Sequence, residues 1–260
     1  MSLFKQRVLA KEGPRAFEQR FQRIVQLAKE KGISFGQIQV VDATHSIADV
    51  DVKKDEERKD RGTGPRDEDA AWGCKGRKRV KTADGKVALV NKTFYGYKTH
   101  LSVNAESELI TSVVVTPGNK PDGQQFPELV KKDEEVGVDA GVYAGDKGYD
   151  DGDNHEMLFC RGKSSALCLN RYRTKKYPEG LWADLKSSED YREGQRQRYK
   201  VEQKNAEAKR RHGLDRCRYL GLAKYAVQAL MTAIAMNLKR MVLLLSGVRF
   251  RGPAGNLARA

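Results

Sequence analysis

The chain has 260 residues, of which 39% are hydrophobic and 32% are charged, so it is long enough to bury a core and is globular on the polar side. Lys and Arg number 49 against 35 Asp and Glu, and this net charge of +14 favours a polyanionic partner, nucleic acid before an anionic membrane. The four cysteines form no C-x-x-C pair and no zinc spacing with the four histidines, which excludes a disulfide framework or zinc site and predicts free thiols.

The first predicted element is an amphipathic helix over residues 14–31, because Phe17 and Phe21 begin a series of apolar residues at helical spacing. It belongs to an N-terminal helical lead that we assign to residues 1–34, and no apolar leader peptide opens the chain. A short β-branched run at 38–44 predicts a strand, with Asp42 near its far end.

Residues 50–93 are charged, contain glycines and lack a clear period, so we expect a long charged loop. Aromatic or apolar residues alternate with polar ones over 94–105, and 109–118 is a more continuous apolar run. The four-residue link between them predicts a β-hairpin. A helix is predicted over 122–135.

A short strand that ends at Asp146 is predicted next, followed by a strand over 164–170. A helix around Glu202 comes before an apolar helix over 222–246. Asn237, Lys239 and Arg240 interrupt the second helix, which indicates a buried core helix rather than a membrane span.

This order of elements predicts a mixed α/β fold with one central sheet. We assign residues 35–246 to one domain built on this sheet and residues 247–260 to a basic tail.

Three residues of the helix around Glu202 fall on one stripe at helical spacing, namely Arg198, Glu202 and Lys209. The segment from 196 to 218 holds nine Lys and Arg against three acids. A carboxylate between two cations suits an acid that binds metal beside side chains that hold phosphate. A solvated helix face with Glu/Lys pairs at helical spacing is the simpler interpretation of this segment taken alone.

Asp42 and Asp146 lie at the ends of predicted strands, where open α/β sheets gather ligands, and Glu202 could pack across those ends. Three carboxylates brought together repel one another unless divalent cations lie between them, which favours oxygen-ligated Mg²⁺. Two such ions catalyse an in-line phosphoryl displacement. Taken alone, an Asp at a strand end is more often a turn or cap residue.

Several phrases, taken in order, give the chain a family resemblance. These phrases are VDAT, YGYKTH, VTPGNKPDG, DKGYD, the spacing R-x3-E-x6-K at Arg198, Glu202 and Lys209, and a long helix with MNLKR. In this order, from about residue 37 to 245, the chain resembles the DDE transposases of bacterial insertion sequences. The family signature is Tyr-x2-Arg-x3-Glu-x6-Lys, and Gln195 occupies its Tyr position here.

The resemblance implies a ribonuclease H-like mixed sheet flanked by helices. It also implies that Asp42, Asp146 and Glu202 bind two Mg²⁺ ions, for which Mn²⁺ can substitute, and so activate water to nick DNA and a 3′-hydroxyl to join it to a target. The residues expected to contact DNA under this resemblance are Arg198, Lys209, Gln195, Lys98, Lys147, Tyr149, Arg210 and Arg211. The YGYK segment and the basic 196–218 region are expected to hold the terminal inverted repeat.

Related enzymes act as dimers on two DNA ends, so we expect a homodimer on DNA in the bacterial cytoplasm, associated with the nucleoid and not with a membrane. Two departures leave alternatives open. Gln195 replaces an aromatic ring that could stack on a base, and only about 35 residues precede the first strand. A catalytically inactive or truncated derivative that occupies the terminal repeats is the main alternative, and another ribonuclease H-like nuclease is the third.

Overall fold

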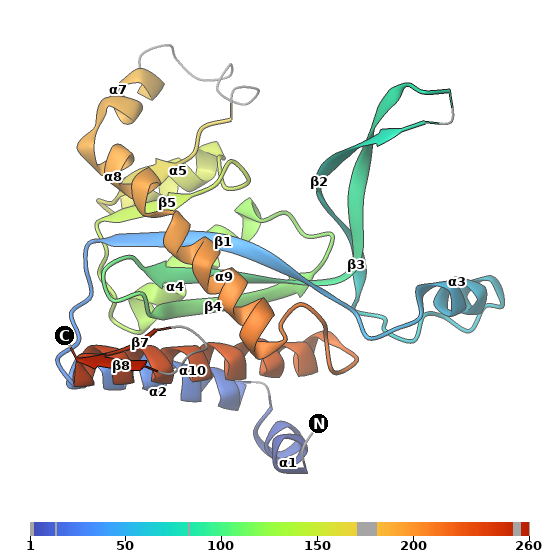
Figure 1. The fold of residues 1–260 in the computed structure, drawn as a ribbon, viewed down its shortest axis with the longest axis horizontal. Coiled ribbons are helices and arrows are strands. Elements are labelled where there is room, and N and C mark those ends of the chain that lie inside the picture. The colour runs from blue at the N-terminus through green and yellow to red at the C-terminus, as the bar shows by residue number, and fades with distance from the viewer. Residues whose placement is uncertain (1–2, 14, 83, 171–180, 252–255, 260) are drawn as a thin grey trace.

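A mixed β-sheet forms the centre of the protein, and helices cover both of its faces (Figure 1). The computed structural model describes residues 3–13, 15–82, 84–170, 181–251 and 256–259. β1 (Ile38–Ile47) pairs antiparallel with β3 (Val87–Asn104) and parallel with β5 (Val142–Gly145). β4 (Ile110–Pro117) pairs antiparallel with β3, and β6 (Ser164–Leu167) pairs parallel with β5.

The body of the sheet therefore has the order β4-β3-β1-β5-β6. It joins an antiparallel meander to two parallel strands, which is compatible with the ribonuclease H-like fold expected from the resemblance. The predicted hairpin is confirmed as β3 and β4. The predicted strands around Asp42 and before Asp146 are confirmed as β1 and β5.

One face of the sheet is covered by α4 (Phe126–Glu135) and α5 (Gly152–Cys160). The core on this side includes Val41 of β1 and Tyr143 of β5, both fully buried. The sequence predicted α4 but not α5, whose short segment has no strong apolar stripe.

The other face is covered by α2 (Arg15–Glu30), α8 (Glu189–Gln197), α9 (Tyr199–His212) and α10 (Leu222–Ser246). The prediction of an amphipathic helix over 14–31 is confirmed, because the apolar residues of α2 are buried in a core shared with the sheet, α9 and α10. The N-terminal lead therefore contributes directly to the core on this face.

The predicted helix over 222–246 is α10, and many of its residues are buried against α2 and β4. By length and composition α10 is the one helix among the described residues that could cross a membrane, and it here packs on the sheet. Carboxylates from the segment before β2 cap its first turn: Asp69 Oδ2 accepts from the Leu222 N–H at 2.8 Å, and Asp67 Oδ1 accepts from the Gly221 N–H at 3.2 Å.

The expectation of a long loop over 50–93 is wrong. The segment contains α3 (Val52–Asp60) and β2 (Ala71–Lys81), and β3 begins at Val87. β2 pairs antiparallel with the first half of β3 to form a two-stranded ribbon that projects away from the body (Figure 1). Solvent surrounds both faces of this ribbon, so its residues show no alternation of apolar and polar side chains.

The remaining described elements lie at the edges of this plan. They are α1 (Leu3–Glu12), η1 (Gly123–Gln125), α7 (Leu181–Ser187), β7 (Val248–Arg251) and β8 (Asn256–Arg259). β7 and β8 pair antiparallel within the segment assigned to the basic tail.

Candidate active site

Asp42 and Asp146 lie side by side because their strands are neighbours. In the parallel pairing of β1 with β5, Val40 lies opposite Ala144, and each acid follows two residues later on its own chain. Adjacent strands lie about 4.8 Å apart, so the Asp42 carboxyl, in the middle of β1, lies close to that of Asp146, which directly follows the end of β5. The fold thus brings together two acids that are about a hundred residues apart in the sequence.

The environment of Asp42 disfavours its charged form. Burial, followed by the negative charge of Asp146, raises the pKa of the Asp42 carboxyl to about 6. Asn205 opposes this shift, because its Nδ2 donates to Asp42 Oδ2 at 2.8 Å. The strain between two neighbouring carboxylates is the situation that a divalent cation relieves.

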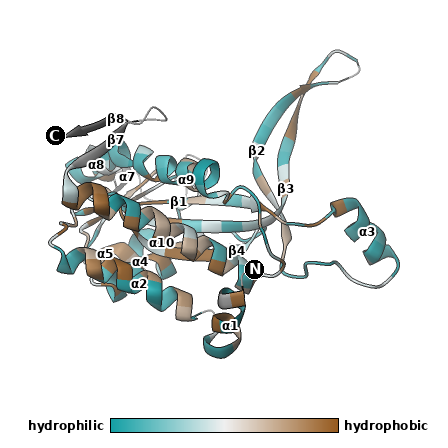
Figure 2. Ribbon diagram, turned by 60° about the horizontal axis from the view of Figure 1, so that its bottom comes forward, coloured by the Kyte–Doolittle hydropathy of each residue, from teal (hydrophilic) through white to brown (hydrophobic). Residues whose placement is uncertain are grey.

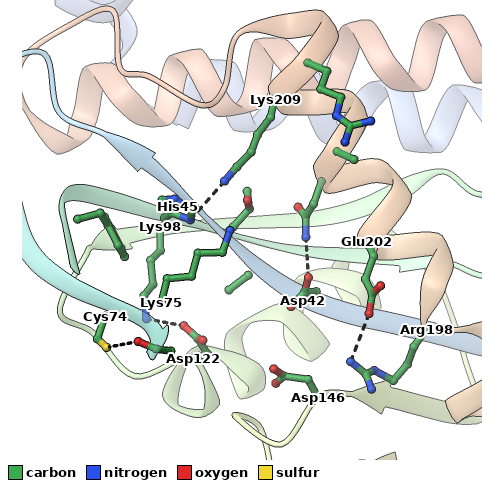
Figure 3. A pocket seen from close by; sticks show the side chains of 17 residues that line it. Asp42, His45, Cys74, Lys75, Lys98, Asp122, Asp146, Arg198, Glu202 and Lys209 are labelled. Carbon is green, nitrogen blue, oxygen red and sulfur yellow. Dashed lines mark hydrogen bonds and ion pairs between the residues drawn. The ribbon is translucent and has the colours of Figure 1, made fainter. Parts of the chain in front are cut away.

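Helix α9 crosses β1 and supplies the third acid (Figure 1). Glu202 lies in its first turn, and its Oε1 lies 3.6 Å from Arg198 Nη2. Figure 3 shows the Glu202 carboxylate turned toward Arg198, with Asp146 to one side of that guanidinium. The predicted stripe of Arg198, Glu202 and Lys209 does face one cleft.

The predicted helix around Glu202 is α9, and Arg198 separates it from α8. Gly194 of α8 lies against the sheet, and a Cβ there would lie 2.5 Å from Ala166 Cβ. The next residue, Gln195, donates from Nε2 to the carbonyl oxygens of Gly145 and Ala166. These contacts fix α8 on β5 and β6, and one of them is made to Gly145, the residue directly before Asp146.

Opposite the acids, three lysines surround His45. Lys209 Nζ donates to His45 Nδ1 at 3.3 Å, and the charges of Lys75 and Lys98 act on the same imidazole. Burial and these cations lower the pKa of His45 to about 4, so it is neutral at pH 7. Burial and Lys75 lower the pKa of Lys209 to about 8. A cluster of cations around a neutral imidazole is suited to an anion.

A fourth acid also lines the cleft. Asp122 Oδ1 accepts from Lys98 Nζ at 2.8 Å, and Lys98 also donates to the Lys120 carbonyl at 2.9 Å. Lys98, which the resemblance assigns to DNA, is thus paired with a carboxylate at the rim of the site. Asp122 lies in the phrase TPGNKPDG, which on its own indicates a turn.

These residues enclose a cleft of about 730 Å³ (Figure 3). Seven residues that the sequence analysis singled out line this cleft: Asp42, Lys98, Asp146, Arg198, Glu202, Lys209 and Arg210. The cleft also contains residues that the sequence did not single out, namely His45, Cys74, Lys75, Asp122 and Asn205. Of these, Asn205 could have been found, because it lies three residues after Glu202 on the same helical stripe.

Four other expected DNA contacts lie outside the lining of the cleft. Lys147 and Arg211 are exposed beside it, and Gln195 is half-buried against the carbonyls of β5 and β6. Tyr149 is fully buried and packs on Phe126, so its expected contact with DNA is corrected: a side chain with no exposed surface cannot touch a phosphate.

The two tyrosines of the YGYK segment need the same correction, since Tyr95 and Tyr97 are buried in the main core, whereas Lys98 of this segment lines the cleft. The glycine of the segment has a steric role: a Cβ on Gly96 would lie 2.1 Å from the carbonyl oxygen of Ser46, so only glycine allows β3 to approach β1 here.

The donor set fits a divalent cation, although the three acids are not assembled. Asp42 and Asp146 supply hard carboxylate oxygens at short range, and nothing cationic is hydrogen-bonded to Asp42 among the described residues. Within the described parts of the chain, no group of three or more His, Cys, Asp or Glu side chains is close enough to hold a metal ion. Glu202 is paired with Arg198 instead of completing the set.

The family model described as "Transposase DDE domain" matches residues 35–238. The match covers every acid of the cleft and all the strands that carry them. No curated protein and no solved structure matches the chain. The family match spans well over half of the 260 residues and coincides with the acid-lined cleft, so the chain belongs to the transposase DDE domain family.

Proposed function

We propose that this protein is a transposase that cuts the ends of its own bacterial insertion sequence and joins them to target DNA. The observation that carries the proposal is the meeting of Asp42, Asp146 and Glu202 with Arg198 and Lys209 in one cleft of a DDE family member. Terminal inverted repeats and target DNA are its substrates. Two copies on two ends are the expected assembly.

Asp42, Asp146 and Glu202 would hold the metal, Mg²⁺ or in its place Mn²⁺, through their carboxylate oxygens. Two ions at such a site activate the attacking oxygen and stabilise the leaving one. The residues of the chain supply position and charge around this chemistry. Asn205 orients the Asp42 carboxylate, and the Gly148 N–H donates to Asp146 Oδ1 at 2.8 Å and so orients the second carboxylate.

Arg198 and Lys209 bind the phosphates on either side of the cut bond. A phosphate that engages Arg198 competes with Glu202 for the same guanidinium, and so frees the Glu202 side chain, which is 60% exposed, to turn toward the two aspartates. DNA binding and completion of the carboxylate set are then coupled through one ion pair.

The direct experiment is strand cleavage of DNA that carries the sequences flanking the coding frame, with Mg²⁺ and purified full chain. We expect nicks at the ends with wild-type protein and a loss of at least about a hundredfold in rate with Asp146→Asn, because removal of one charged ligand disrupts the metal set.

Asp139→Asn is the matched control, since this carboxylate is 98% exposed and lies outside the cleft. Cleavage by Asp146→Asn at the wild-type rate would contradict the assignment of Asp146. Salt-dependent binding of the ends with no cleavage in any divalent ion would instead indicate a DNA-binding derivative.

A further inference from the structure

Residues 74–93, the exposed ribbon formed by β2 and the first part of β3, are called the arm here. Beyond Gly73 every residue of β2 is exposed, and the β3 residues 89–93 opposite them are exposed as well. In this stretch β2 pairs with β3 alone, and the ribbon stands clear of the body in both views (Figures 1 and 2).

The arm is strongly basic. It carries seven Lys and Arg residues against one acid, Asp84. That acid is paired with Lys86 at the turn, 3.5 Å away. The other six cations make no ion pair with any described part of the chain. They are Lys75, Arg77, Lys78, Arg79, Lys81 and Lys92. Six uncompensated charges on one narrow ribbon repel one another and are stabilised by a polyanion.

The strand register divides these charges between two faces. Arg77, Arg79 and Lys81 alternate along β2, so all three project from the same face of the ribbon. They span about 13 Å of strand, roughly the length of four base pairs of DNA. Lys78 projects from the opposite face, beside Val80 and its cross-strand neighbour Ala88. The ribbon therefore has one face with three cations in a row.

The arm also exposes apolar side chains, which indicates that a partner covers the ribbon. Val87 and Leu89 are 61% and 63% exposed and lie opposite Lys81 and Arg79. A free two-stranded ribbon is marginally stable in water. A DNA major groove is about 12 Å wide and admits such a ribbon, with cations against the phosphates.

The arm begins inside the active-site cleft. Cys74, Lys75 and Gly76 at its base line the same cleft as Asp42 and Glu202. A register shift lies between Cys74 and Arg77, and Gly76 there has a φ of +73°, which favours glycine and turns the ribbon as it leaves the body. DNA held by the acids would therefore pass directly onto the arm.

We propose that the arm is a DNA-binding ribbon that grips the duplex beside the cleaved bond, with Arg77, Arg79 and Lys81 on its phosphates. This inference rests on the proposed function insofar as duplex DNA is the substrate. It adds a second contact region beyond the cleft, at Arg77, Arg79 and Lys81. The segment that carries this region was predicted from sequence only as a loop.

The test measures binding of the full chain to a fluorescein-labelled duplex of about three helical turns, by anisotropy, without divalent ions. Salt is varied from roughly 50 to 200 mM. The slope of log affinity against log salt is negative, and each lost phosphate contact lowers its magnitude by about 0.9. The triple variant Arg77→Gln, Arg79→Gln, Lys81→Gln is expected to lower the slope by about 2.7, and Arg79→Gln alone by about 0.9.

The matched control removes three exposed cations from α3, which also projects from the body, through Lys53→Gln, Lys54→Gln and Arg58→Gln. The slope of this control is expected to equal that of wild type. A wild-type slope in the arm variants, or an equal fall in arm and control variants, would overturn the proposal. So would an unchanged slope accompanied by loss of a dimer in sedimentation, which would assign the arm to contacts between copies.

The binding measurement uses no metal, so it is independent of cleavage. If wild-type protein binds DNA and the arm variants bind it with the same slope, the arm is not a DNA contact, and the proposed function is unaffected. Wild-type protein that does not bind duplex DNA at any salt concentration would remove both.

Discussion

Lys209 shows how position within the cleft sets the charge of a single side chain. It is half-buried beside Lys75 and donates to His45, and its pKa is lowered to about 8. A lysine is cationic below its pKa, so Lys209 is mostly charged at pH 7 and mostly neutral at pH 9. A phosphate contact through this side chain should therefore weaken as the pH rises through 8.

We expect the affinity of wild-type protein for duplex DNA to fall about tenfold between pH 7 and pH 9, which corresponds to ~1.4 kcal/mol for one charge-assisted hydrogen bond. Lys209→Arg keeps its charge over this range and should lose this dependence. Anisotropy titrations at fixed ionic strength measure both proteins. Parallel pH profiles for the two would show that Lys209 does not contact DNA.

At the scale of elements, the fit of α8 on the sheet positions the residues that follow it. Gly194 lies where a side chain would meet Ala166 and Ala144, and Gln195 bonds the carbonyls at the ends of β5 and β6. Arg198 and Glu202 come directly after these contacts. The aromatic residue of the family signature is replaced here by a Gln that bridges two strands.

Gly194→Val should force α8 away from β6, because its Cβ alone would lie 2.5 Å from Ala166 Cβ. We expect a loss of about 1–3 kcal/mol in stability, as for an overpacked core, and a larger loss in cleavage than in DNA binding. Thermal unfolding and the cleavage assay measure the two effects. Asp190→Val, at an exposed position of the same helix, is the control, and identical behaviour of the two variants would refute the role of this contact.

The elements that could be predicted from sequence are those with buried apolar residues. α2 leaves a helical apolar pattern because one of its sides packs on the core, and α10 leaves a long apolar run because many of its residues are buried. The arm leaves none, since both of its faces are exposed, and it was expected to be a loop. Asp42, Asp146 and Glu202 could be found through family phrases. Asp122 also lies in such a phrase, but the phrase indicates only a turn, and the fold shows that this turn reaches the cleft. Lys75 could not be found, because only the folding of the arm brings it to the cleft.

At the scale of the whole molecule, positive charge and acids are arranged around one region. The cleft contains four acids among lysines and arginines, the arm extends from its edge, and α9 crosses it with the basic 196–218 segment. On the same face of the sheet as α9, α2 and α10 pack together (Figure 1). The net charge of +14 is thus concentrated where a DNA substrate would lie, and the rigid sheet holds the acids beneath it.

We propose that Asp42, Asp146 and Glu202 form a metal site for DNA cleavage. Anomalous diffraction at the manganese edge, from crystals of the full chain grown with DNA and Mn²⁺, tests it most directly. We expect anomalous density between the carboxylates of Asp42 and Asp146, with Glu202 turned away from Arg198 to join them. Manganese density elsewhere, with Glu202 still paired to Arg198 and no peak at the two aspartates, would contradict it.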